Sequence, residues 1–376
     1  MKATKLFKEF FESEKSGGII LIFCTLISII LANSSFGNHY IDFFHVKVAG
    51  SSIEHWVNDA LMTIFFLLIG LELEREIYIG ELSKIKDASL PIFGAIGGMF
   101  VPALIYLLFN IGTESQSGAG IPMATDIAFA IGILSLLGNK VPISLKVFLT
   151  ALAVIDDLGA IIVIAIFYTK EIVWFNLLIV LIILLVLFIF NRLKVKSILI
   201  YLIGGVFMWY FMLKSGVHAT ITGVLLAFVI PFGNGDENST SYKLQHWLHK
   251  PVAYFILPLF ALTNTAIVFN KETLLAINNN TSIGIFLGLF LGKPLGVILF
   301  TYLSTLFGLS KLPKTINWKL MFGVGILAGI GFTMSIYVTM LAFENGKLIN
   351  NSKLIVIITS LFSGVAGYLF LRRNLK

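Results

Sequence analysis

Two adjacent aspartates, Asp156 and Asp157, lie in the middle of an apolar run that extends from Leu149 to Tyr168. An α-helix rises about 1.5 Å per residue, so a run of about 20 residues crosses the hydrocarbon core of a bilayer. A carboxylate at mid-depth costs about 2.5 kcal/mol or more to insert, and such residues usually mark an ion pathway. The pair therefore predicts an ion- or proton-binding site inside a membrane.

The composition indicates an integral membrane protein. Of the 376 residues, 57% are hydrophobic and 12% are charged, whereas soluble domains have about 25% charged residues. No polar stretch is long enough for a soluble domain, so residues 1–376 are expected to form one transporter domain in the lipid bilayer. The single cysteine, Cys24, excludes a disulfide framework and a thiolate metal site.

Twelve apolar runs follow a polar N-terminal segment, residues 1–16, and predict twelve transmembrane helices. An even number of spans places both termini on one side of the membrane. The predicted spans are 17–33, 58–78, 88–110, 121–137, 144–168, 172–190, 197–213, 216–231, 251–269, 281–307, 320–343 and 353–371.

The positive charges orient these spans. Of the 27 Lys and Arg residues, Lys293 lies within a span, 20 lie in segments on the side of the N-terminus, and six lie opposite: Lys47, Lys170, Lys214, Lys271, Lys347 and Lys353. Because positive charges gather on the cytoplasmic side, both termini are predicted to be cytoplasmic. The net charge of +7 thus reflects topology rather than binding to nucleic acid.

Two spans and one loop have distinctive sequences. Pro122 interrupts span 4, and span 11 is glycine-rich from Gly323 to Gly331. Broken helices at matching positions predict inverted repeats, here spans 3–5 and 10–12, with the site at crossed breaks.

The outer, periplasmic loop 34–57 contains a β-rich run and a small-residue turn, which predict a small β-hairpin near 43–54; an irregular loop is the alternative.

Four charged residues lie at mid-membrane depth: Asp126, Asp156, Asp157 and Lys293. They could form a salt bridge that only holds the bundle together, but we favour a Lys293 that pairs with one acid in one state and releases it in another. Oxygen ligands suit Na⁺ or Li⁺, and burial with mutual repulsion favours binding of a proton. A site that holds either a proton or a sodium ion is the minimum for an antiporter.

Each of several other polar residues has either a structural or a functional interpretation. Asp126 and Lys293 could offset the charges of half-helix termini, and Thr125 could cap a break or offer an oxygen. Glu72 and Glu76 share a helix face, either as a solvated helix end or as a funnel that attracts cations and senses pH. His218 is either structural or pH-sensing. Two further histidines, His246 and His249, are expected on the surface.

The chain resembles the NhaA family of bacterial Na⁺/H⁺ antiporters, a known example of inverted repeats. The resemblance covers spans 2 to 11 in order: Asn58-Asp-Ala-Leu-Met, Phe66-Leu-Leu-Ile-Gly-Leu-Glu72, Ala124-Thr-Asp-Ile-Ala-Phe-Ala130, Ala153-Val-Ile-Asp-Asp-Leu-Gly-Ala160, Ser215-Gly-Val-His-Ala-Thr220, Leu257-Pro-Leu-Phe-Ala261, Gly292-Lys-Pro-Leu-Gly296 and Gly329-Ile-Gly-Phe-Thr-Met-Ser335. It implies a multi-pass protein of the bacterial inner membrane that exchanges two protons for one Na⁺ or Li⁺, electrogenically and without a cofactor.

The resemblance also implies residue roles. It places ion binding on Asp157 and on Asp156, with Asp156 alternating between the ion and Lys293. It places Asp126 and Thr125 at the helix crossing. Three further positions match pH activation: Glu72, Glu76 and His218.

The chain departs from the family's sequence at one position, and the resemblance also implies a homodimer. Gln245 stands where the family has a glutamate, so the family's pH profile is not carried over. The hairpin near 43–54 matches a homodimer contact, although it is short here.

Three other functions would use similar features. A Na⁺-coupled symporter of an organic solute would have similar broken helices and a pocket for the solute. An intramembrane aspartyl protease needs two aspartates on different helices, which the adjacent pair disfavours. A passive channel would conduct without coupled exchange.

Overall fold

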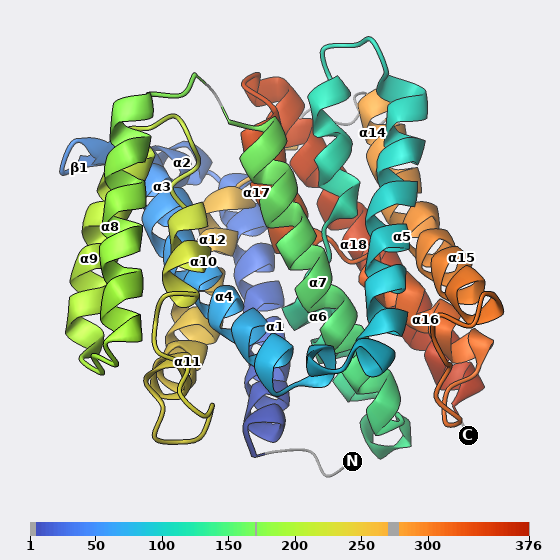
Figure 1. Ribbon diagram of the computed structural model, residues 1–376. Coiled ribbons are helices and arrows are strands. Elements are labelled where there is room, and N and C mark those ends of the chain that lie inside the picture. The colour runs from blue at the N-terminus through green and yellow to red at the C-terminus, as the bar shows by residue number, and fades with distance from the viewer. Residues whose placement is uncertain (1–4, 170, 270–277, 376) are drawn as a thin grey trace.

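The computed structural model describes residues 5–169, 171–269 and 278–375, and apart from one small hairpin their regular structure is helical. Figure 1 shows two neighbouring groups of helices, with both termini at the same end of the molecule. The first bundle consists of α1 (Lys5–Ala32), α2 (Gly37–His45), α3 (Ile53–His55), η1 (Trp56–Leu61), α4 (Met62–Tyr78), α8 (Trp174–Arg192), α9 (Ile198–Leu213), α10 (Ile221–Ala227), α11 (Thr240–Pro251), η5 (Val252–Ile256) and α12 (Leu257–Asn264).

The second bundle contains the predicted broken helices. Its main helices are connected to the first bundle by η2 (Glu81–Ser83), and α1 also packs against α6. The second bundle consists of α5 (Ile85–Asn110), η3 (Gln116–Met123), α6 (Ile127–Leu136), η4 (Gly138–Lys140), α7 (Ile143–Phe167), α14 (Asn280–Leu287), η7 (Gly288–Gly292), α15 (Lys293–Leu306), α16 (Trp318–Ala328), α17 (Phe332–Ala342) and α18 (Gly346–Asn374).

The helices confirm a polytopic membrane protein but not the number of spans. Within the described residues, seven helices are long and apolar enough to cross a bilayer, or up to nine if each of two bent pairs is one span. The predicted spans 7 to 9 fall on shorter helices, α9, α10 and α12 with η5. The count of twelve therefore stays a prediction.

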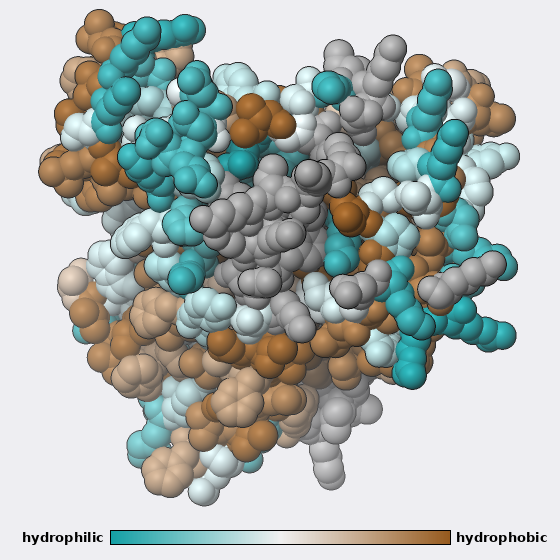
Figure 2. All heavy atoms as spheres, turned by 90° about the horizontal axis from the view of Figure 1, so that it is seen from below, coloured by the Kyte–Doolittle hydropathy of each residue, from teal (hydrophilic) through white to brown (hydrophobic). Residues whose placement is uncertain are grey.

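Polar side chains gather at the end of the molecule where the termini lie. Figure 2 looks onto this end and shows hydrophilic residues gathered at the upper left and along the right, with hydrophobic residues at the left and over much of the lower part. This arrangement suits a protein whose rim contacts lipid and whose end faces water.

The predicted hairpin is present, but it is shorter than expected. Strand β1 (Lys47–Val48) pairs antiparallel with β2 (Ser51–Ser52) through a turn in which Ala49 and Gly50 have φ of 51° and 92°. The prediction of strand from Phe43 was wrong, because residues up to His45 belong to α2. Phe44 is buried on one face of that helix, so tertiary packing overrides its preference for strand.

Helices α5 and α15 approach at two glycines. A Cβ at Gly97 would lie 2.1 Å from the carbonyl oxygen of Gly296 and 2.7 Å from Cβ of Phe300. This contact brings α15, which carries Lys293, close to α5. The close approach therefore depends on the absence of a side chain at Gly97.

Gly97→Ala is expected to lower the melting temperature of the purified protein in detergent, because overpacking against a backbone atom costs about 1–3 kcal/mol or more. The matched control is Gly346→Ala, since a Cβ there has no atom within 4 Å. Equal melting temperatures for the two variants would show that α5 and α15 do not need this contact.

Candidate ion-binding site

The two breaks predicted in the sequence meet each other. Residues 124–126 separate η3 from α6, and residues 329–331 separate α16 from α17, which are bent by 47°. The amide of Asp126 donates to the carbonyl oxygen of Ile330 at 2.6 Å. Unwound backbone at membrane depth thus finds its partner in the other broken helix, as burial in protein requires.

Asp126 connects the N-terminal ends of two half-helices. Its Oδ1 accepts from the amide of Phe129 in the first turn of α6 at 3.0 Å. Its Oδ2 accepts from the amide and the hydroxyl of Thr333 in α17, at 3.0 and 2.5 Å. A carboxylate at this position offsets the partial positive charge of both helix ends.

Lys293 and Thr125 serve the opposite ends of the broken helices. The ammonium group of Lys293 contacts the carbonyl oxygen of Met123, the last residue of η3. The hydroxyl of Thr125 lies 2.9 Å from the carbonyl oxygen of Ala328, the last residue of α16. The crossing therefore has its negative group at two N-termini and its positive group at a C-terminus.

A buried ion pair links this crossing to the aspartate pair on α7. Asp156 Oδ2 contacts the ammonium of Lys293 and lies 2.7 Å from the hydroxyl of Thr125. Both charged side chains are 0% exposed, and Asp157 beside them is 2% exposed. Within the described residues, Asp156 Oδ1 has no hydrogen-bond partner.

Chemically, the arrangement offers carboxylate oxygens that an internal ammonium group already occupies. Adjacent residues of a helix point about 100° apart, so Asp156 faces Lys293 while Asp157 points in another direction. A monovalent cation of similar charge could replace the ammonium at Asp156. Asp156 can therefore exchange one positively charged partner for another.

The other predicted residues fall into two separate places. Glu72, on α4, lies 3.6 Å from Nε2 of His249 on α11. His218 precedes α10, and its Nε2 lies 2.9 Å from the carbonyl oxygen of Tyr168, just after α7. Gly223 of α10 packs on Thr63, at the start of α4, so His218 lies toward the end of α4 that is remote from Glu72.

The α4–α11 contact includes residues that sequence reasoning missed. His249 was expected on the surface, but it is 7% exposed. Ser241 donates to buried Glu74 at 3.3 Å, and Gln245 is buried between Ser241 and His249 on the same face of α11. The spacing of four residues between these three positions was the available signal.

Thr333 and Gly98 were also missed at the crossing. Thr333 follows the second break, as α6 follows the first, and this symmetry could have identified it. A Cβ at Gly98 would lie 3.7 Å from Nζ of Lys293, so this glycine leaves space beside the ammonium group. The Gly97-Gly98 pair gave no further signal in the sequence.

Fold and site together indicate a polytopic membrane transporter with buried charged groups at paired helix breaks. The comparisons with known proteins agree. The model of the family "Na+/H+ antiporter 1" matches residues 8–371, and the chain belongs to this family. The resemblance to the NhaA family is thereby confirmed.

Relatives match over nearly the whole chain. The Na(+)/H(+) antiporter NhaA of Flavobacterium psychrophilum is 65% identical over 100% of this chain and 98% of its own. The protein of the same name from Cytophaga hutchinsonii is 58% identical, over 100% and 97%. The structure of the sodium proton antiporter MjNhaP1 from Methanocaldococcus jannaschii has a TM-score of 0.56, with 15% identity over 97% of each chain, which supports the fold.

Asp126→Asn is expected to destabilise the protein, because an amide group would face donors that now bind a carboxylate. The expected loss is about 1–3 kcal/mol, seen as a lower melting temperature in detergent. The control is Asp42→Asn, at an exposed position of α2. If Asp126→Asn has the same melting temperature as the wild type, the carboxylate does not hold the crossing together.

Proposed function

We propose that the protein exports Na⁺, and also Li⁺, in exchange for protons across a bacterial inner membrane. The observation that carries this proposal is the buried pair of Lys293 with Asp156 beside Asp157. A buried pair is costly to desolvate, and charged residues inside a membrane commonly mark ion and proton pathways. No cofactor takes part, since the exchange needs only oxygen ligands and titratable groups.

The exchange follows from competition for one carboxylate. In the proton-loaded state, Lys293 is an ammonium group bound to Asp156, and Asp157 is a neutral carboxylic acid. When Na⁺ binds both carboxylates, Lys293 and Asp157 each release one proton. Two protons thus leave for one Na⁺. The net charge of the site becomes more negative by one, so transport is electrogenic.

Thr125 and Asp126 support this step without changing protonation. The hydroxyl of Thr125, 2.7 Å from Asp156, can offer its oxygen to the ion once Lys293 has left. Asp126 keeps the two broken helices together while the ion changes. Their proposed role is therefore to hold the geometry of the crossing.

We further propose the topology and assembly that the sequence predicts. The chain has twelve spans with inverted repeats in spans 3–5 and 10–12, and both termini are cytoplasmic. Two copies form a homodimer through the 43–54 hairpin, which is tied to α9 because Trp56 donates to Val48 at 2.8 Å and stacks on Trp209. Cross-linking in membranes would test the dimer.

Asp156→Asn and Asp157→Asn are each expected to abolish Na⁺-dependent proton release from acid-loaded inverted vesicles, because a neutral amide cannot exchange a proton for a cation. The readout is dequenching of a pH-sensitive dye, with Asp42→Asn as the control that keeps wild-type exchange. Wild-type rates in both site variants would rule out this site.

The same assay with Na⁺ and Li⁺ separates the proposal from its alternative, a Na⁺-coupled symporter of an organic solute. An antiporter releases protons in buffer that contains no organic solute. A symporter would release none until its solute is added. Repeating the assay from pH 6 to pH 9 gives the pH response of exchange.

Regulation by pH is part of the proposal, with Glu72, Glu76 and His218 as candidates. The contact of Glu72 with His249 supports the α4–α11 interface as the place. His218 lies at the other end of α4 and would act independently. The charged groups at this interface include Glu74 and Arg75, whose guanidinium lies 5.3 Å from the ring centre of Tyr242.

Gln245→Glu is expected to shift the pH at which exchange begins, because it adds a carboxylate between Glu72 and Glu74. Exchange is measured from pH 6 to pH 9, with Gln116→Glu at an exposed position as the control. An unchanged onset in Gln245→Glu would show that this interface does not sense pH.

A further inference from the structure

One face of α17 leads from the helix crossing toward the end of the molecule opposite the termini. Thr333, Tyr337 and Met340 are four and three residues apart, so they lie on the same side of this helix. Thr333 binds Asp126 at the crossing. Tyr337 and Met340 therefore mark two successive layers between the ion-binding site and the outer end.

The lower layer joins the two bundles through Tyr337. Its hydroxyl lies 2.6 Å from that of Thr220, which precedes α10, and its ring centre lies 5.5 Å from that of Phe66 on α4. Tyr337 and Phe66 are each 1% exposed. This layer closes the path with aromatic rings and one hydrogen bond.

In the upper layer, two amide side chains of the first bundle contact Met340 and Lys353 of the second. Asn264 at the end of α12 donates to Asn58 of η1 at 2.7 Å, and Asn58 lies 3.5 Å from the sulfur of Met340. Lys353 of α18 donates to Oδ1 of the same Asn264 at 3.4 Å. Lys353 is thus a charged group of this layer.

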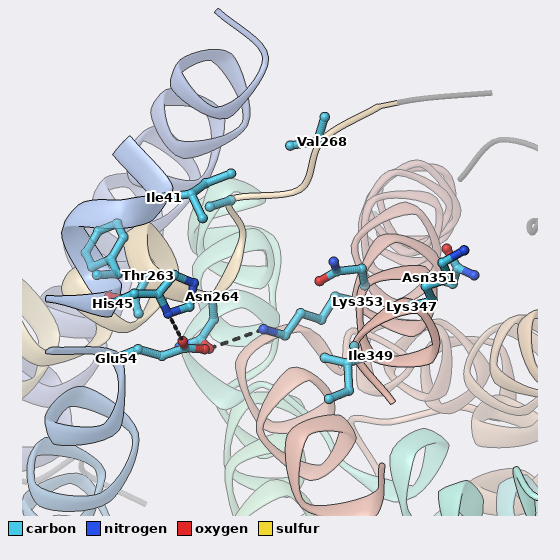
Figure 3. Close-up of a pocket in the computed structure, with 14 residues that line it drawn as sticks. Ile41, His45, Glu54, Thr263, Asn264, Val268, Lys347, Ile349, Asn351 and Lys353 are labelled. Atoms are coloured by element: carbon cyan, nitrogen blue, oxygen red, sulfur yellow. Dashed lines mark hydrogen bonds and ion pairs between the residues drawn. The ribbon is translucent and has the colours of Figure 1, made fainter. Parts of the chain in front are cut away.

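Lys353 is unusual because its ammonium group is buried and faces a cavity. The side chain is 6% exposed, and Figure 3 shows it extending from α18 toward Asn264, with Glu54 and His45 on the opposite wall. The cavity has a volume of about 630 Å³ and also contains Lys347. Glu54 pairs with His45 at 3.5 Å and also attracts Lys353 electrostatically, while the hydrogen bond of Lys353 is to the neutral Asn264.

We propose that Lys353 is the gate residue of the outer path: bound to Asn264, it holds the two bundles together at the outer end and places a positive charge in the route of the exported cation. Repulsion by the ammonium group keeps external Na⁺ from re-entering. Opening the path separates Lys353 from Asn264, and exported Na⁺ then passes into the cavity. This role rests on the proposed exchange of Na⁺ for protons.

The first test measures Na⁺ from each side of the membrane. Lys353→Met is expected to lower the KM for Na⁺ added to the outer face by about tenfold, because a like charge leaves the route. The KM for Na⁺ at the inner face should change little. Lys353→Arg should keep the wild-type values, and Lys347→Met, an exposed lysine of the same cavity, is the matched control.

A second test needs no transport. Met340→Cys in a Cys24→Ser background reports on the upper layer, to which Lys353 belongs, through its rate of labelling by a membrane-impermeant maleimide added outside. Adding Lys353→Met should raise this rate about tenfold, if loss of the contact opens the layer by ~1.4 kcal/mol. Adding Lys347→Met should leave the rate unchanged.

The outcomes separate this inference from the proposed function. If the wild type exchanges Na⁺ for protons but Lys353→Met matches Lys347→Met in both tests, Lys353 is not a gate. If the wild type shows no exchange, the proposed function fails, while the labelling test still decides whether Lys353 closes the outer layer. A drop in melting temperature for Lys353→Met with unchanged labelling and KM values would leave Lys353 a structural role only and would overturn the proposal.

Discussion

The structure depends on a fully buried ion pair between Lys293 and Asp156. Removing two charges from water costs several kcal/mol for each ion, and their attraction repays this cost only with good geometry and further hydrogen bonds. The carbonyl oxygen of Met123 in η3 and the hydroxyl of Thr125 in the break after it supply those contacts, and Gly98 of α5 leaves space beside the ammonium group. The pair is therefore a product of the whole second bundle.

The broken helices supply polar groups that offset the cost of burying this pair in a membrane. Breaking two spans frees backbone groups that lipid could not satisfy. Here each break supplies the partner of the other, as Asp126 and Ile330 do, and the freed carbonyl of Met123 binds Lys293. The same irregularity that costs hydrogen bonds within a helix thus creates the polar surroundings that an ion site needs.

Much of this arrangement could be read from the residues. The apolar runs, the breaks and the mid-membrane charges are local patterns, and local patterns predicted the helical fold, both broken spans and the small hairpin. The burial of His249 at the interface of α4 with α11 was not predicted in this way. His249 reads as a surface residue because its neighbours His246 and Lys250 are polar, yet its side of the helix is buried against Glu72.

The sequence alone determined which charges enter the membrane and where its helices break, because hydropathy, proline and glycine act within a few residues. The residues alone left open which acid pairs with Lys293, and only the resemblance implied Asp156; the tertiary structure shows the contact, because it depends on how the helices pack. In the packed structure, Asp126 lies at two helix N-termini and Asp156 contacts Lys293. The tertiary structure likewise placed Lys353, which the sequence shows only as an outer lysine, in a buried contact between the two bundles. Such contacts join residues far apart in the chain, and no local pattern encodes them.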